Sequence, residues 1–419
     1  MTLRQSKMAA PMWRVFACRG FGEMNFQFQV QKWKRSCAFC MKLHTGRHLS
    51  VPQEETADSG AALPRAAFRT SESNPVRHSL QHEAQFYTIP ENEVQSLFPV
   101  GFRKRFVKQI KTFNEAAVMI RKPAVEVIHS LKETNFENPP IRYVLFGKRG
   151  SGKTLCLAHV MHYCMKEGWL VIHVPDGHGW NRAKRWDVNA SSYNEDLVDK
   201  PMTGIEWLKH FKARNEGFLK QLKTTNKYTW SRREVTEAGQ PLMEVVDQGI
   251  NRAKNSCDAV GVVLKELQLQ SGPETFRLLL AVRGVNAFFG DVTQTRRDDK
   301  TIVHVRELSL VRHFKKTLKS DWKNGAIVSS VDQHGAYKQP DESHLPKYLL
   351  TKEGFELMDP FIPVHVDKYS EKEIESCLDY YSDRQWLQHP QAQTEDGRKE
   401  LKFLSYYNPA ELDRICGGL

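Results

Sequence analysis

The sequence contains no run of about 18 apolar residues, the length that a membrane-spanning helix requires. Its longest apolar stretches are short and interrupted, which is typical of buried strands. The sequence therefore predicts a protein without a membrane span. The hydrophobic fraction of 40% is still enough for a core, and 419 residues exceed what one core usually serves. We expect two domains, or one large domain with appended segments.

Cysteines are few, and their spacing is not that of a disulfide framework. The chain has eight, widely scattered, which fits a reducing compartment. Cys37 and Cys40 form a C-x-x-C pair, but no second pair follows. We interpret this pair as incidental rather than as a metal or redox site.

Acidic residues are nearly absent from residues 1–50, which carry nine lysines and arginines and a single acid, Glu23. A basic segment with scattered aromatic residues is typical of a mitochondrial targeting segment. A secretory signal would need an unbroken apolar centre, which Pro11 and Arg14 interrupt. We expect the segment to be removed on import; the alternative is a disordered basic tail.

The rest of the chain is only mildly basic. The whole sequence has 61 basic and 49 acidic residues, so 52 and 48 remain beyond position 50, a net charge of +4. That excess by itself indicates little about partners.

Composition and periodicity divide the remainder of the chain. Residues 51–86 are rich in Ser, Pro, Ala and charge without a period, which predicts an extended tail or linker. From Phe106 to Leu131 apolar residues recur at helical spacing, Ala117 and Ile120 among them, and Pro123 starts a second short helix. We expect one domain over 87–345 and a smaller, mainly helical C-terminal domain over 346–419.

Apolar runs of strand length alternate with helical patterns, which predicts an α/β fold with a parallel sheet flanked by helices. The region 187–260 is too long for an ordinary crossover and has amphipathic periods, so we expect a helical insertion there. The five expected strands cover residues 141–146, 169–174, 275–282, 325–331 and 361–366.

Within the expected insertion, residues 209–233 contain eight lysines and arginines and one acid, Glu216, with aromatic residues interleaved. Such a segment could bind phosphate backbone and stack on bases. It could equally be a solvated charged helix whose aromatic side chains pack inward. The sequence leaves both interpretations open.

Residues 147–154 read GKRGSGKT, which fits the phosphate-binding loop G-x-x-x-x-G-K-[ST] in full. A strand-like run precedes it and a helix-like run follows, as the motif requires. Lys153 is predicted to neutralise the β- and γ-phosphates and Thr154 to bind Mg²⁺. The glycines turn backbone amides toward phosphate, and the helix N-terminus adds partial positive charge. The complete predicted loop is Gly147, Lys148, Arg149, Gly150, Ser151, Gly152, Lys153 and Thr154.

A hydrolytic P-loop enzyme usually has an aspartate at the end of a second apolar strand, often followed by a glutamate. Here Arg283 and Gly284 occupy those positions. Arginine cannot bind Mg²⁺ or accept a proton, so hydrolysis is doubtful. Asp176 ends the preceding strand-like run, and we favour a helix-cap or turn role for it. Ser329 and Ser330 end another run, either as γ-phosphate sensors or, more plainly, as turn residues.

Several longer segments resemble the death-associated protein family, the P-loop proteins of the mitochondrial small ribosomal subunit. The resemblance runs from about residue 87 to the C-terminus and is far more specific than the loop alone. It is carried by the segments KTFNEAAVMIRKPAVEVIHSLK, IRYVLFGKRGSGKTL, DAVGVVLKEL, NGAIVSS and KEGFELMDPFIPVHVDKYSEKEIESC.

The resemblance implies an AAA-like P-loop NTPase fold, a mitochondrial matrix location and bound GTP or GDP; the loop itself does not distinguish these from ATP. It implies small-subunit rRNA and ribosomal proteins as partners, with contacts to the large subunit, and a link to programmed cell death. It places Met119 and Arg121 near the base. Arg283 departs from the family's pattern, which has an aspartate there.

Three functions of different classes follow. The first, which we favour, is a structural ribosomal protein that holds a nucleotide as a folding and docking element. The second is an active NTPase switch in ribosome assembly, which Arg283 weakens. The third is a signalling adaptor in apoptosis that acts independently of the ribosome.

Overall fold

The computed structural model describes most of the chain beyond residue 66 as one compact unit. The expected targeting segment, with Cys37 and Cys40, and residues 51–66 of the expected tail lie outside the described residues. The described residues are 67–98, 104–182, 187–191, 194, 196–272, 275–297, 299–319, 321–333 and 343–417.

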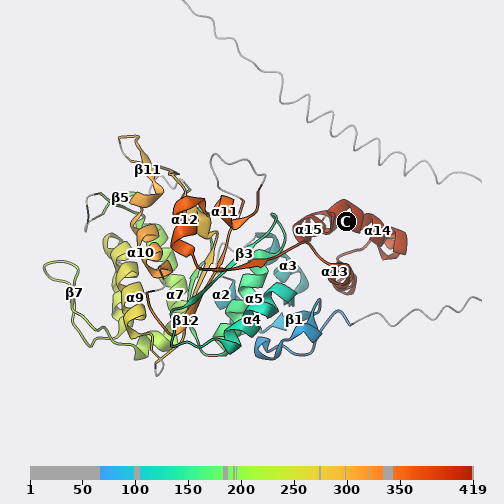
Figure 1. The fold of residues 1–419 in the computed structure, drawn as a ribbon, viewed down its shortest axis with the longest axis horizontal. Coiled ribbons are helices and arrows are strands. Elements are labelled where there is room, and N and C mark those ends of the chain that lie inside the picture. The colour runs from blue at the N-terminus through green and yellow to red at the C-terminus, as the bar shows by residue number, and fades with distance from the viewer. Residues whose placement is uncertain are drawn as a thin grey trace, which may run out of the picture. The chain divides into compact units, whose positions relative to one another are not determined.

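A five-stranded parallel sheet forms the centre of this unit (Figure 1). Its strands are almost wholly buried, apart from the edge strand β13, because helices cover both faces, as is usual for parallel sheets. All five predicted strands are confirmed, with ends shifted by a few residues at most. They are β3 (Ile141–Phe146), β4 (Leu170–Val174), β9 (Leu278–Arg283), β12 (Gly325–Ser330) and β13 (Ile362–His365).

The strand order is β13-β3-β12-β9-β4, so β3 has β12 and β13 as neighbours and β9 lies one strand further away. Because all strands are parallel, their carboxyl ends meet at one edge of the sheet. Ligands of open α/β sheets bind at that edge. Gly147, Arg283 and the residues after Ser330 therefore all lie there.

One face of the sheet is covered by helices from the middle of the chain, together with α12 near its end. Trp207 and Phe211 on α7 pack against sheet residues such as Ile172 and Leu280. The region 187–260 contains both helices and short strands, and its helices are part of the main core. The helices are α7 (Pro201–Gln221), α8 (Leu242–Asn251), α9 (Ser256–Gln270), α10 (Ser309–Leu318) and α12 (Thr351–Met358).

Short elements connect these helices and the strands. They are α6 (Gly177–Trp180), β5 (Asn189–Ala190), β6 (Val198–Asp199), β7 (Tyr228–Thr229), β8 (Val235–Thr236), η3 (Ala253–Asn255), η4 (Val285–Phe289), β10 (Val292–Arg296), β11 (Ile302–His304), η5 (Val305–Glu307) and α11 (Pro346–Leu349).

The opposite face is covered by α2 (Glu91–Leu97), α4 (Lys122–Glu133) and α5 (Lys153–Lys166). Alternate residues of each strand point to this side; Tyr143 and Leu145 do so, whereas Val144 faces the other core. Pro123 lies in the first turn of α4, as the sequence predicts.

The segment before α4 differs from its predicted structure. The helical period was extended to Ile120, but α3 (Lys104–Phe113) ends near Asn114, which adopts a left-handed φ of 50°. Residues Ala116–Met119 form β2, which pairs antiparallel with β1 (Phe86–Ile89). The helical prediction for Ala117 and Ile120 is therefore wrong.

The expected tail also ends earlier than residue 86. Within it, η1 (Pro75–Arg77) and η2 (Leu80–His82) form short 3-10 helices, and His78 and Ala84 are buried. These residues pack against α5, for example through the hydrogen bond between His78 Nδ1 and His159 Nε2.

The C-terminal helices pack against one another and against β1, β2 and α3 in a third core cluster, which includes Met119 and Tyr380. The expected boundary at residue 346 is too early, because Leu350 and Met358 belong to the main core and β13 is a strand of the central sheet. The C-terminal helices are α13 (Glu371–Asp383), η6 (Pro390–Gln393), α14 (Glu395–Ser405) and α15 (Pro409–Cys416).

In the part of the chain that the structure describes, no helix combines the length and apolar character needed to cross a membrane.

Candidate nucleotide-binding site

The GKRGSGKT loop joins β3 to α5 at the carboxyl edge of the sheet, in the context that its motif requires. Gly147, Gly150 and Gly152 have φ values of 147°, 85° and 101°. Residues with a side chain rarely adopt a backbone conformation with such a positive φ, so each position favours glycine. A Cβ on Gly147 would lie 2.1 Å from Val366 O, and one on Gly150 would lie 2.4 Å from Asn408 Oδ1. The backbone therefore forms a cradle that only these glycines permit.

Lys153 and Thr154 open α5 and are both buried. Lys153 Nζ donates to Gly147 O at 2.8 Å and to Lys148 O at 3.1 Å, so the ammonium group lies across the loop. The helix N-terminus contributes partial positive charge at the same point. This donor set fits a nucleotide phosphate group, with Thr154 supplying a hydroxyl suited to Mg²⁺.

Two segments distant in sequence contact the loop backbone and hold it in place. Asn408 Nδ2 donates to Arg149 O at 2.9 Å, and Ala410 N donates to Gly150 O at 3.2 Å. On the other side, Arg149 N donates to Gln333 Oε1 at 3.0 Å. The loop thus contacts both the N-terminus of α15 and the segment after β12. Lys148 and Arg149 themselves have exposed side chains, whereas Ser151 is buried.

Arg121 connects the loop to the C-terminal helices. Its Nη1 donates to Ser151 O at 2.5 Å, while Nε and Nη2 donate to Glu373 Oε1 and Oε2 at 2.8 and 3.0 Å. Burial lowers the pKa of Arg121, but the hydrogen bond and charge of Glu373 outweigh it and leave the pKa raised above its ordinary value. Arg121 is therefore a charged link between the loop and α13.

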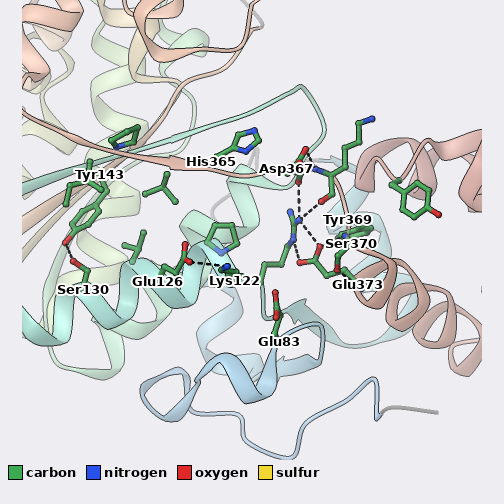
Figure 2. Close-up of a pocket in the computed structure, with 18 of the residues that line it drawn as sticks. Glu83, Lys122, Glu126, Ser130, Tyr143, His365, Asp367, Tyr369, Ser370 and Glu373 are labelled. Atoms are coloured by element: carbon green, nitrogen blue, oxygen red, sulfur yellow. Dashed lines mark hydrogen bonds and ion pairs between the residues drawn. The ribbon is translucent and has the colours of Figure 1, made fainter. Parts of the chain in front are cut away.

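A cavity of about 730 Å³ opens beside Arg121. Figure 2 shows it between α4, which carries Lys122 and Glu126, and the end of β13, which carries His365. Its volume lies in the usual range for small-molecule sites. Met119, which the resemblance places near the base with Arg121, lies on β2 with its side chain in the third core cluster.

At the end of β9, Arg283 occupies the position where hydrolytic P-loop enzymes have an aspartate. Its Nη1 donates to Pro175 O at 3.1 Å, and its Nε lies 3.6 Å from Asp332 Oδ2. The other oxygen of Asp332 lies 3.8 Å from Lys153 Nζ. Asp332 was not predicted from the sequence, although its place two residues beyond β12 is a signal that could have indicated it.

The other polar residues at this edge have structural contacts. Asp176 occupies the N-cap position of α6 without a capping hydrogen bond and pairs with Arg182 at 3.6 Å, which agrees with the favoured helix-cap position. Ser329 and Ser330 lie within β12 rather than in a turn. Ser329 Oγ donates to Tyr143 O at 3.3 Å, and Ser330 Oγ accepts from Gly284 N at 3.3 Å.

Comparison with protein families and curated proteins gives a consistent result. The family model described as mitochondrial ribosomal death-associated protein 3 matches residues 118–415. Small ribosomal subunit protein mS29 of Bos taurus is 50% identical over 386 residues, which cover 90% of this chain and 97% of that protein. The Mus musculus protein of the same name is 47% identical over 372 residues, with coverages of 89% and 95%.

Similarity to solved structures is weaker. A Walker-type ATPase of Pyrococcus abyssi has a TM-score of 0.36 at 13% identity and covers 71% of this chain and 65% of its own. The S. cerevisiae Hsp104-ADP complex has a TM-score of 0.30 at 13% identity, with coverages of 78% and 47%. At such scores the fold assignment rests on the chain's own strand order and loop.

Proposed function

The chain belongs to the mitochondrial ribosomal death-associated protein 3 family, and we propose that it is a structural component of the mitochondrial small ribosomal subunit that holds a nucleotide. The proposed location is the mitochondrial matrix. The observation that carries the nucleotide proposal is the glycine cradle with Lys153 lying across it.

We propose that Gly147 through Thr154 hold the phosphates, with Thr154 as a ligand of Mg²⁺. The base is proposed to lie near Arg121, which contacts the loop through Ser151 O and also lines the cavity described above. Met119 contributes indirectly, because it packs β2 against the C-terminal helices that border this cavity. GTP or GDP is the proposed ligand from the family resemblance, since the loop's contacts with phosphate do not select guanine over adenine.

The arrangement favours a retained nucleotide over a hydrolysed one. Arg283 and Gly284 offer no carboxylate at the end of β9. The loop is also fixed by Gln333, Asn408 and Arg121 from three parts of the fold. A nucleotide there would stabilise the contact between the loop and the C-terminal helices, as a folding element does.

For rRNA binding we propose the exposed cations of residues 209–233. Stacking is not part of this proposal, because Trp207 and Phe211 are buried in the main core and Trp230 bonds to Thr236. Contacts with ribosomal proteins, including some of the large subunit, belong to the same proposal. The cations exposed in this segment are Lys209, Lys220, Lys223, Lys227, Arg232 and Arg233.

Two measurements test this function against its alternatives. Mass identification of the ligand extracted from purified protein should give GDP or GTP, and a protein purified without any nucleotide would contradict the proposal. Co-sedimentation with mitochondrial small subunits distinguishes the ribosomal role from an adaptor that acts apart from the ribosome. A turnover assay distinguishes a retained ligand from an NTPase switch.

A further inference from the structure

The site contains a carboxylate, but on a different strand from the one where P-loop enzymes usually have it. Their aspartate follows the second apolar strand and holds Mg²⁺ through water. That strand is β9 in this fold, and it ends in Arg283. Asp332 instead follows β12, which lies between β9 and the loop strand β3. Asp332 therefore starts one strand closer to the phosphate loop.

Asp332 lies between the two cations of the site. Its Oδ1 is 3.8 Å from Lys153 Nζ and its Oδ2 is 3.6 Å from Arg283 Nε, and its side chain is only 15% exposed. An ordinary surface aspartate would be solvated. This one contacts the lysine that defines the phosphate loop.

The backbone of Asp332 is fixed as well. Asp332 N donates to Asn286 Oδ1 at 3.0 Å, and Asn286 Nδ2 donates to Asp332 O at 2.9 Å. Arg283, whose Nη1 is held by Pro175 O, approaches the carboxylate from the β9 side. The carboxylate is thus oriented before any ligand binds, which is what a metal-supporting group requires.

We infer that Asp332 replaces, from β12, the aspartate that β9 lacks, and that it supports the Mg²⁺ of a bound nucleotide. Arg283 is then a positioning residue that orients Asp332 rather than a ligand. The inference rests on the proposed nucleotide binding and adds a metal-supporting residue to that site.

The charge of Asp332 should affect nucleotide affinity in opposite directions with and without Mg²⁺. A carboxylate beside a phosphate site repels the nucleotide when no metal is present and attracts it when Mg²⁺ lies between them. Removing the charge of Asp332 should therefore weaken binding in Mg²⁺ and leave it equal or stronger in EDTA. A residue that matters only for folding would change both conditions in the same direction.

The experiment measures GDP affinity by calorimetry, using full-length protein stripped of nucleotide, in excess Mg²⁺ and in excess EDTA. The unaltered chain should bind at least about tenfold more tightly with Mg²⁺, equivalent to about 1.4 kcal/mol. Asp332→Asn should reduce this ratio to near one. Asp176→Asn is the matched control, because Asp176 lies at the same edge but pairs with Arg182, and it should keep the full ratio.

If Asp332→Asn does not fold, the inference can still be tested with Asp332→Glu and with a spectroscopic signal from the bound metal ion. With Mn²⁺ and GDP, the electron paramagnetic resonance signal of bound Mn²⁺ should be present in the unaltered chain and retained in part by Asp332→Glu. An Asp332→Asn protein that keeps the full Mg²⁺ ratio, or an unaltered chain that shows no ratio, overturns the inference while nucleotide binding stands. Absence of GDP binding under both conditions instead overturns the proposed function itself.

Discussion

Arg121 and Glu373 form the most deeply buried ion pair at the site, with side chains only 7% and 5% exposed. The pair joins residues 252 positions apart and connects the phosphate loop, through Ser151 O, to the start of α13. Glu373 also accepts from Ser370 N in the capping box of that helix. One carboxylate thus caps a helix and neutralises the cation that holds the loop.

Glu373→Gln keeps the shape of the side chain but leaves Arg121 as an unpaired buried charge. Breaking a buried pair in this way typically costs about 3–5 kcal/mol. We expect a loss of that order in the free energy of unfolding, measured by urea denaturation. Glu126→Gln is the control, because its pair with Lys122 is exposed and worth at most about 1 kcal/mol. Equal free energies of unfolding of the two variants would show that the Arg121–Glu373 pair does not stabilise the fold.

A second group of buried residues predicts a pH dependence. His78, His159 and His162 lie between the N-terminal segment and α5; His162 also bonds to Tyr87 OH and Glu93, and Lys166 lies close by. Burial lowers the pKa of all three, to about 4 for His162 despite the opposing effect of Glu93. In the unfolded chain each has a pKa near 6.5.

Below pH of about 6.5 the unfolded chain therefore binds protons that the folded chain does not, and the free energy of unfolding should fall as the pH falls toward 4. His162 alone accounts for about 3 kcal/mol over that window. Urea denaturation at a series of pH values measures the slope, and His162→Gln should flatten it. His129→Gln, on an exposed residue of α4, should leave the slope unchanged. A slope that persists in His162→Gln would assign the effect to other groups.

At the scale of elements, most aromatic side chains of α7 and the β7–β8 hairpin pack against the core, whereas many cations of this region are exposed. Trp207 and Phe211 lie in the main core and Phe218 and Trp230 pack against it, whereas Tyr228 OH donates to Glu266. Six cations of residues 209–233 remain exposed; of these, Lys220 and Lys227 have local acidic partners. The solvated-helix interpretation is therefore correct for the aromatic residues, and the charge alone is left for a phosphate-bearing partner.

Reversing Lys220, Lys223 and Lys227 to Glu should impair incorporation into the small subunit, because each change replaces attraction to rRNA with repulsion. Nucleotide affinity should stay the same, since the segment lies away from the loop in the fold. Arg77, Lys352 and Lys399 reversed to Glu form the control, because all three are exposed and also have local acidic partners. Sedimentation of tagged protein with subunits measures the outcome; equal incorporation of both triple variants would remove this surface from the proposal.

Among the individual strands and helices, some could be predicted from the sequence and others could not. The five strands of the sheet were predictable because each is a largely apolar run of strand length, buried on both faces apart from the edge strand β13. Residues Ala116–Met119 were not, because a short strand buried on every side has no period of two and continued the helical spacing of α3 by chance. Only the left-handed Asn114 ends that helix, and asparagine alone is a weak signal.

For the whole molecule, the limits of sequence reasoning lie in contacts between distant segments. The phosphate loop follows from eight consecutive residues, but Asn408 reaches it from 259 positions away, and Asp332 reaches Lys153 from the segment after β12. No local spacing encodes such pairs. The C-terminal helices therefore seemed a separate domain, whereas in the structure they contact the loop directly and share a core with β1 and β2.

If the nucleotide is a fixed part of this assembly, stability should depend on its presence. Lys153→Ala removes the ammonium group that lies across the loop, so it should abolish retention of GDP or GTP through loss of charge-assisted hydrogen bonds. A ligand that binds only the folded state at a hundredfold excess over its Kd stabilises by about 2.7 kcal/mol. The Tm of the unaltered chain should therefore rise with added GDP, and that of Lys153→Ala should not.

Turnover distinguishes this role from a switch. With Arg283 at the end of β9 and no glutamate after it, GTP or ATP hydrolysis by the unaltered chain should be far slower than about one per second, the lower bound of typical enzymes. Asp332 does not change this expectation, because its inferred role is to support Mg²⁺, whereas activation of the attacking water usually needs a second carboxylate, and Gly284 stands in its place. Phosphate release measured on the full chain, with Lys153→Ala as the blank, distinguishes a retained nucleotide from an NTPase switch. A rate near one per second that Lys153→Ala abolishes would make the protein an NTPase, and its Tm would then depend on which nucleotide, substrate or product, is bound.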